Sequence, residues 1–83
     1  MCEQEFSIDA RNMVQDYYIN NNNPISYDNI YIVWICKILQ NNKCLISTTV
    51  EDGLYFEITY NGDKKEFYFD VYKKQENHKT KED

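Results

Sequence analysis

The chain has 83 residues, of which 42% are apolar, 16% aromatic and 28% charged. These values are typical of one globular domain and exclude a multidomain enzyme, since independent domains usually need about 50–200 residues each. Nine Lys and Arg residues against fourteen Asp and Glu residues give a net charge of −5. A field of that sign repels phosphate backbones and anionic lipid, so we expect neither nucleic acid nor a membrane as the partner.

Signals for export, membrane insertion and metal binding are weak in this sequence. Its first residues are acidic, whereas a secretory signal begins with basic residues. The longest apolar stretch, Ile30–Leu39, contains Lys37 and is shorter than the roughly 20 residues of a membrane-spanning helix. The three cysteines form no C-x-x-C pair. We therefore expect a cytoplasmic protein without disulfide framework, metal or cofactor.

The segment Glu3–Ile19 has the apolar spacing of an amphipathic helix. Its apolar residues follow one another at intervals of one, three and four and share one helical stripe. They are Phe6, Ala10, Met13, Val14, Tyr17 and Tyr18. Asn favours turns and proline disfavours a helical residue before it, so the helix should end within Asn20–Pro24. The connecting loop is then Asn20–Asp28.

Two strand-like runs near the end of the chain predict a hairpin. Leu54–Tyr60 and Glu66–Lys73 alternate apolar and polar residues and flank Asn61-Gly62, the strongest short turn signal in the sequence. A loop of two or four residues pairs positions of the same parity. The apolar face then carries Leu54, Phe56, Ile58, Phe67, Phe69 and Val71.

The preceding strand continues this apolar face through Cys44, Ile46 and Val50. Glu51-Asp52-Gly53 is interpreted as a three-residue loop with Gly53 in the left-handed conformation. This loop pairs Val50 with Leu54, Thr48 with Phe56 and Ile46 with Ile58. A two-residue Asp52-Gly53 turn is the second choice, because it would place Ser47 and Thr49 beside Phe56 and Ile58.

The first strand-like run, Ile30–Leu39, is apolar at both odd and even positions. Such a run is typical of a strand that is buried on both faces. The turn after it, Gln40–Lys43, permits either register, so the face that Trp34 occupies stays open. From Lys74 onward the chain is polar with mixed charge, and we expect a disordered tail there.

Together these elements predict an α+β fold in which one N-terminal helix packs across a four-stranded antiparallel β-meander of order 1-2-3-4. The single domain spans residues 1–73 and the tail spans residues 74–83. The predicted core consists of Phe6, Ala10, Met13, Val14, Tyr17, Ile46, Val50, Leu54, Phe56, Ile58, Phe67, Phe69 and Val71.

Two stretches of the chain carry a family resemblance. They are VWICKILQNNKCLIST from Val33 to Thr48 and DGLYFEITYNGDKKEFYFDVYKK from Asp52 to Lys74. With VW, CK-x-LQN-x-K, DG-x-Y and TYNGDK in this order, they resemble a family of small uncharacterised proteins carried by phages and prophages of low-GC Gram-positive bacteria. The resemblance covers about half of the chain. It implies a phage context and the cytoplasm of the bacterial host, and it transfers no catalytic residue.

The sequence offers little for catalysis. His78, the one histidine, lies in the polar tail, away from any nucleophile that it could activate. Glu57 and Asp70 form a candidate carboxylate pair, but exposed strand carboxylates usually serve solubility, and the sequence indicates no apolar pocket around this pair. Turns account for both glycines, so no phosphate-binding loop is indicated. We therefore predict that the protein is not an enzyme.

The sheet face opposite the predicted helix alternates aromatic and acidic residues. On the last two strands these are Tyr55, Glu57, Thr59, Tyr68, Asp70 and Tyr72. One helix covers only one face of such a sheet, so we expect the other face to be covered by a second copy of the chain, by a different protein, or by the loop Asn20–Asp28 folding back with Ile25 and Tyr27. Tyrosines are also ordinary strand formers with hydroxyls in water, but tyrosine-rich surfaces with few lysines are typical of protein interfaces. The candidate protein-binding residues are Trp34, Tyr55, Glu57, Tyr68, Asp70 and Tyr72.

These observations predict a non-enzymatic phage accessory protein that binds a protein partner, either a host factor or a second copy of itself, through this face. Analogy with other small acidic phage proteins favours inhibition of a host defence or replication component. The alternative is a homodimeric module that binds a small ligand or nucleotide between two copies, around Trp34 and Tyr55.

Overall fold

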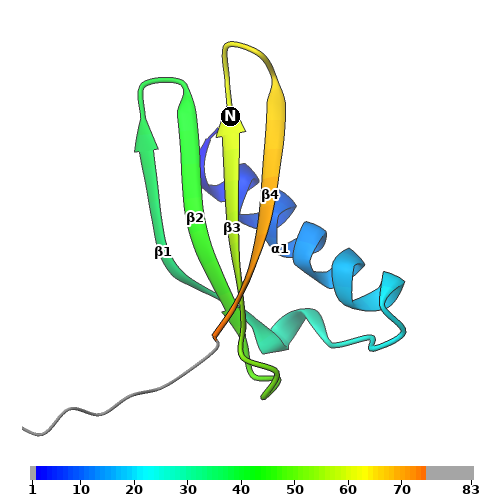
Figure 1. Cartoon of the computed structure of the whole chain (residues 1–83). Coiled ribbons are helices and arrows are strands. Elements are labelled where there is room, and N and C mark those ends of the chain that lie inside the picture. Colours follow the sequence, from blue (N-terminus) through cyan, green and yellow to red (C-terminus); the bar gives the residue numbers. More distant parts are fainter. Residues whose placement is uncertain (1, 75–83) are drawn as a thin grey trace, which may run out of the picture.

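The computed structural model describes residues 2–74 and shows one helix lying across a four-stranded antiparallel sheet (Figure 1). The elements are α1 (Glu3–Asn20), the 3-10 turn η1 (Tyr27–Asn29), β1 (Ile30–Ile38), β2 (Asn41–Thr48), β3 (Leu54–Asn61) and β4 (Glu66–Lys73). The strands lie in the order β1-β2-β3-β4, so the predicted α+β fold is confirmed. The predicted tail, apart from Lys74, lies outside the described residues.

Helix α1 has local caps at both ends. The Cys2 Sγ accepts a hydrogen bond of 3.4 Å from the Glu5 N–H, and acidic residues occupy the first turn, where they complement the helix dipole. At the other end Asn22 has a φ of +59°, and the Asn23 N–H donates to the Tyr18 carbonyl over 2.9 Å. Asn tolerates this left-handed conformation better than most residues, so the asparagine run ends the helix as predicted.

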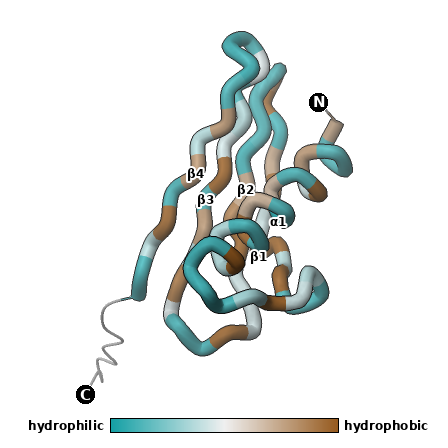
Figure 2. Tube along the Cα trace, turned by 90° about the vertical axis from the view of Figure 1, so that its right-hand side faces the viewer, coloured by the Kyte–Doolittle hydropathy of each residue, from teal (hydrophilic) through white to brown (hydrophobic). Residues whose placement is uncertain are grey.

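The core lies between α1 and the inner face of the sheet, which is the face turned toward the helix. Its fully buried residues are Phe6, Ala10, Val14 and Tyr18 of α1 and Ile30, Cys44, Ile46, Phe56 and Ile58 of the strands. Phe56 is central, with ring centroids 5.4 Å from Tyr17 and 5.7 Å from Tyr18. Apolar and polar positions alternate along β4, as Figure 2 shows. The hydrophobic effect therefore holds one face of the sheet against the helix.

Two predicted core residues of β4 are exposed. Phe67 and Val71 are 36% and 38% exposed, because α1 packs mainly across β1, β2 and β3. The helix meets β4 through two ring contacts, Phe6 with Phe67 at 6.4 Å and Tyr17 with Phe69 at 5.9 Å between centroids. The prediction that Phe67 and Val71 belong to the core was therefore wrong, whereas Phe69 is half-buried against it.

The register between β2 and β3 differs from the prediction by two residues. Ile46 pairs with Phe56 rather than with Ile58. The loop is longer than predicted, so Val50 lies outside β2 and is half-buried rather than part of the core. Gly53 has a φ of +72°, as predicted. Because the shift is even, the strand residues keep their predicted faces.

Asp52 fastens this longer loop to the helix and to the start of β3. Its carboxylate accepts hydrogen bonds from the Tyr18 hydroxyl, at 2.5 Å, and from the Leu54 N–H, at 3.1 Å. Tyr18, which was not in the predicted core, is 2% exposed. Burial and the hydrogen bond to Asp52 raise the pKa of Tyr18 to about 12. The loop thus fastens the β2–β3 connection to the helix.

Strand β1 is not buried on both faces, contrary to the prediction. A β-bulge changes its pairing with β2: Ile32 pairs with Ile46, whereas Trp34 pairs with Leu45. Val33 and Trp34 are consequently 51% and 42% exposed. The strand is apolar at both odd and even positions because the bulge changes which of these positions point to the inner face of the sheet. It is not a strand that is buried on both faces.

The hairpin turns also differ in detail. The β1–β2 turn is Leu39-Gln40, not Gln40–Lys43, and Leu39 has a φ of +55°. The β3–β4 loop has four residues, which is one of the two predicted lengths, and Lys65 has a φ of +54°. The two hairpin tips meet, because the Gly62 N–H donates to the Asn41 Oδ1 over 3.1 Å.

Candidate functional site

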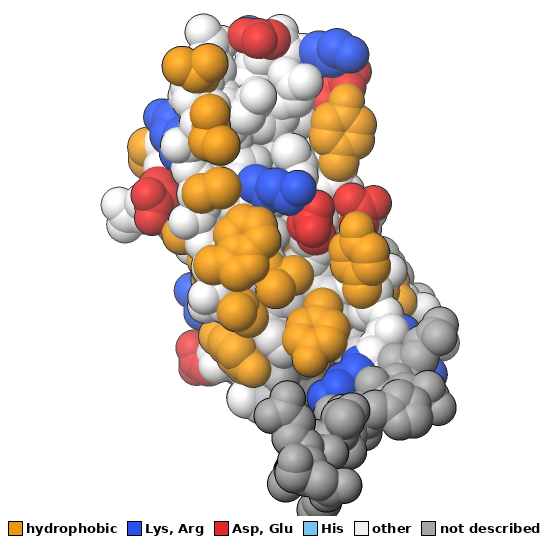
Figure 3. All heavy atoms as spheres, turned by 60° about the vertical axis from the view of Figure 1, so that its left-hand side comes forward, with side chains coloured by type: hydrophobic (Ala, Val, Ile, Leu, Met, Phe, Trp, Pro, Cys, Tyr) orange, Lys and Arg blue, Asp and Glu red, His pale blue; other side chains and the backbone are white. Residues whose placement is uncertain are grey.

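The sheet face turned away from α1, called the outer face below, brings the six predicted binding residues together (Figure 3). One row across the four strands consists of Trp34, Leu45, Glu57 and Asp70. The tyrosines occupy the neighbouring rows, with Tyr55 opposite Tyr72 and Tyr68 opposite Thr59. The bulge places Trp34 on this face, which the sequence had left open. Within residues 2–74, no other segment covers the outer face (Figure 1).

The centre of the outer face holds an ion pair. The Lys43 Nζ lies 2.9 Å from the Glu57 Oε1. This hydrogen bond and the charge of Glu57 raise the pKa of Lys43. Solvent screens an exposed pair of this kind, so it contributes little to stability, but it directs Glu57 toward β2. Asp70, directly opposite Glu57 on β4, is exposed and takes no part in this ion pair.

The tyrosines of β4 are the most accessible aromatic groups of the six candidates. Tyr68 and Tyr72 are 44% and 49% exposed, whereas Tyr55 is half-buried. The Tyr68 hydroxyl donates to the Glu66 Oε2 over 2.7 Å, and this hydrogen bond raises the pKa of Tyr68. A tyrosine side chain with few rotatable bonds gives contact area at low entropic cost.

An apolar band that the sequence analysis missed runs along β1 beside these tyrosines. Its members are Tyr31, Val33, Trp34, Ile38 and Leu39, which are 42–89% exposed. In Figure 3 the band forms a column of apolar side chains on one side of the face. Leu39 is the most exposed, in a conformation that bulky residues rarely adopt. Apolar positions on both sides of an edge strand were the signal for this band.

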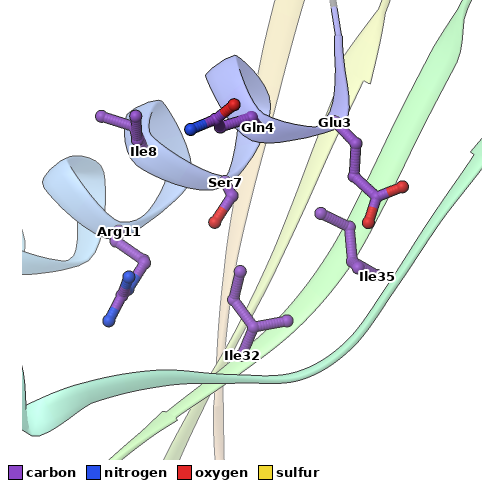
Figure 4. Close-up of a pocket in the computed structure, with 7 residues that line it drawn as sticks. All are labelled: Glu3, Gln4, Ser7, Ile8, Arg11, Ile32 and Ile35. Carbon is purple, nitrogen blue, oxygen red and sulfur yellow. The ribbon is translucent and has the colours of Figure 1, made fainter.

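A groove separates the N-terminal half of α1 from β1 on the inner side of the sheet (Figure 4). Its volume is about 570 Å³, and Ser7, Ile8, Ile32 and Ile35 lie along it. Glu3 lies beside Ile35 at one end, and Arg11 lies near Ile32 at the other. The groove therefore has an apolar floor with opposite charges at its ends.

Arg11 connects the helix to the beginning of β1. Its Nε and Nη2 donate to the Ile30 carbonyl over 3.1 and 2.8 Å, and its guanidinium lies 4.4 Å from the centroid of the Tyr27 ring. These contacts fix the guanidinium at the edge of the groove. Within residues 2–74, no carboxylate forms an ion pair with Arg11.

The cysteines differ in accessibility. Cys2 and Cys36 are exposed and Cys44 is buried. Burial raises the pKa of the Cys44 thiol to about 12, so this thiol stays protonated and unreactive. Among residues 2–74, no cluster of three or more His, Cys, Asp or Glu side chains could hold a metal ion. No helix in that part of the chain is long and apolar enough to cross a membrane.

Fold and surface together define a small α+β protein with an aromatic outer sheet face. The sequence model of one protein family, described as 'Family of unknown function (DUF6275)', matches residues 7–82, which is nearly the whole chain. The chain belongs to this family, so its predicted place among uncharacterised proteins is confirmed. Comparisons with curated proteins and with solved structures found no match.

Proposed function

We propose that this protein is a non-enzymatic phage accessory protein that acts by binding a protein partner through the outer face. The observation that carries the proposal is the gathering of exposed aromatic and aliphatic side chains on that one face. Trp34, Tyr68 and Tyr72 are each 42–49% exposed, and the apolar band of β1 continues beside them. Contiguous apolar patches of this kind mark interaction sites more often than isolated apolar residues do.

The composition of the outer face supports a protein as the partner. Trp and Tyr are the residues that most often contribute a large share of binding energy in protein interfaces. The Lys43–Glu57 pair at the centre and the exposed Asp70 supply polar groups that give a contact its orientation. Two carboxylates among the rings also disfavour the stacking of nucleic-acid bases, which needs positive charge nearby.

The phage context of the proposal comes from the combination of VW, CK-x-LQN-x-K, DG-x-Y and TYNGDK. A host component of defence or replication, which the protein would inhibit in the bacterial cytoplasm, is the partner that this context favours. This step rests on analogy with other small acidic phage proteins.

The proposal is tested by affinity capture from a lysate of the bacterial host. The bait variant is Tyr68→Ala with Tyr72→Ala, because both side chains are half in solvent and their truncation leaves the core intact. The matched control is Ile19→Ala, an apolar truncation at a 49% exposed residue of α1. Far-UV circular dichroism establishes that both variants fold.

We expect wild-type protein and Ile19→Ala to retain the same host protein, and the double variant to lose at least about tenfold in affinity for it, as for two hot-spot residues. Equal recovery of every host protein by all three baits would contradict the proposal. A rise in Tm with an added nucleotide, without any captured protein, would instead favour a ligand-binding module.

A further inference from the structure

Strand β1 presents a free backbone edge at the groove. The Asn29 carbonyl accepts a hydrogen bond from the Thr49 N–H and therefore points toward β2. The Ile30 carbonyl accepts from Arg11 and points outward, away from β2 and toward the free edge of the sheet. Backbone groups of successive strand residues alternate between the two sides. Ile32 thus points its N–H and C=O outward, and beyond the bulge Ile35 does the same. Figure 4 shows the side chains of both residues directed into the groove.

This edge lacks most of the devices that protect edge strands. Natural edges are usually blocked by charged side chains, proline or a covering segment. The sequence of β1, IYIVWICKI, contains one charged residue, whereas β4 at the other edge reads EFYFDVYK. In Figure 1 no described segment lies beyond β1. β1 is therefore the edge that is open to strand addition.

The bulge favours one kind of occupant. Between Ile32 and Ile35 the outward-pointing positions are three residues apart instead of two, so a regular strand cannot pair on both sides of the bulge. A second copy of β1, antiparallel and related by a two-fold axis at the bulge, carries the same irregularity at the same place. Ile32 then faces Ile35 of the second copy on one side of the axis, and Ile35 faces Ile32 on the other. About four main-chain hydrogen bonds join the strands.

The charges of the groove are self-complementary under the same symmetry. Arg11 lies near Ile30 and Ile32, and Glu3 lies beside Ile35. Antiparallel pairing brings Arg11 of each copy toward Glu3 of the other. A two-fold interface contains every contact twice, so two such ion pairs form. Ile8, which is 46% exposed, then lies between two helices rather than in water.

We infer that the occupant of this edge is a second copy of the chain, which joins β1 to β1 and merges the two sheets into one eight-stranded sheet with both helices on the same side. The contact uses the inner groove and the strand edge. It leaves the outer face free and does not depend on the function proposed for that face.

Sedimentation equilibrium of the full chain tests the inference first. We expect a mass of twice 10.1 kDa at about 100 μM protein, which is far above a Kd in the micromolar range. Hydrogen exchange at the Ile32 and Ile35 amides should slow as the protein is concentrated. A monomer at 100 μM, or a dimer in which these amides exchange as fast as in dilute protein, would overturn the inference.

Charge reversal locates the contact. Glu3→Arg and Arg11→Glu should each raise the Kd of the dimer about tenfold or more, because like charges then meet at two places. The double variant should bring the Kd back close to the wild-type value. Tyr68→Ala with Tyr72→Ala is the matched control and should leave the Kd unchanged. The opposite result would be loss of dimerisation in the double tyrosine variant and normal dimerisation of Glu3→Arg and Arg11→Glu. It would place the interface on the outer face, and the inference would be wrong.

Discussion

Asn42 is the clearest case of a side chain that costs this fold stability. It lies in β2 between two neighbouring strands, opposite Lys37 and Tyr60, and is 1% exposed. Neither its Nδ2 nor its Oδ1 has a hydrogen-bond partner among the described residues. A buried amide without partners costs about 1–3 kcal/mol. We therefore predict that Asn42→Leu, which keeps the branched shape and the number of side-chain heavy atoms, stabilises the protein.

The expected gain combines two effects. Removal of the unpartnered amide recovers about 1–2 kcal/mol, and the new aliphatic contacts with Tyr60 and the adjacent core contribute a further amount of about 1 kcal/mol. Some of the gain is lost to imperfect packing. The free energy of unfolding should rise by about 2 kcal/mol, and the Tm by about 10 °C for a domain of this size.

Urea unfolding followed by far-UV circular dichroism measures this change, at one fixed protein concentration so that any self-association affects all variants alike. Asn42→Ala is the control: it removes the amide but leaves a cavity, so its stability should stay within about 1 kcal/mol of wild type. A loss of 1 kcal/mol or more in Asn42→Leu would show that the amide forms hydrogen bonds in the folded protein, and the reasoning would be refuted.

Three further predictions concern the core, the pH dependence and the hairpin tips. Phe56→Ala should lower the free energy of unfolding by about 3–5 kcal/mol in the same urea assay, because Phe56 is fully buried, and a loss below 1 kcal/mol would contradict the assigned core. Tyr18 has a folded-state pKa of about 12, above its ordinary value of 10.0. Its neutral hydroxyl therefore contributes fully to the free energy of unfolding below pH 10, and this contribution is lost as the pH rises to 12. Two pKa units correspond to about 2.7 kcal/mol, which solvent screening reduces to about 2 kcal/mol. We therefore expect the free energy of unfolding of the wild-type protein to fall by that amount between pH 9 and pH 12, and the Tyr18→Phe variant to lack this fall. Equal pH profiles of the two proteins would rule out this linkage. Gly62→Ala should cost about 1–3 kcal/mol, because its methyl group would lie 2.1 Å from the Gln40 carbonyl oxygen, and an unchanged Tm would show that the tips do not meet.

The parts of the fold that depend on local periodicity could be predicted from the sequence. The spacing of Phe6, Ala10 and Val14 defines the buried stripe of α1, and all three are fully buried. Strand parity fixed the faces of β3 and β4 even though the loop lengths were uncertain, because an even change in register leaves every face unchanged. The left-handed Gly53 was predicted for the same local reason.

Features that depend on contacts between distant segments could not be predicted. The Tyr18–Asp52 hydrogen bond joins residues 34 positions apart and fastens the β2–β3 loop to α1. Gly62 was attributed to its own turn, but its φ is not positive, and the tight approach of Gln40 from the other hairpin is what requires glycine there. Local sequence patterns contain no information on such approaches.

The candidate site shows the same division. Parity placed Tyr55, Tyr68 and Tyr72 on one face, but the position of Trp34 depended on the bulge at Val33, for which the sequence has no turn residue as a marker. The groove was also missed, because Arg11 meets the Ile30 carbonyl across 19 positions of the chain. When a strand has apolar residues at both odd and even positions, a bulge in an edge strand should therefore be considered before burial on both faces is predicted.

The unequal accessibility of the three cysteines makes the protein easy to equip with an optical reporter. Cys36 lies on the outer face opposite Lys43, whereas the Cys44 thiol is shielded. Cys2→Ser replaces the sulfur acceptor at the start of α1 by a hydroxyl oxygen and leaves one thiol that a maleimide dye can reach. A fluorophore at Cys36 would then brighten, dim or change polarisation as a partner docks beside it, which provides a titration signal with a single conservative substitution.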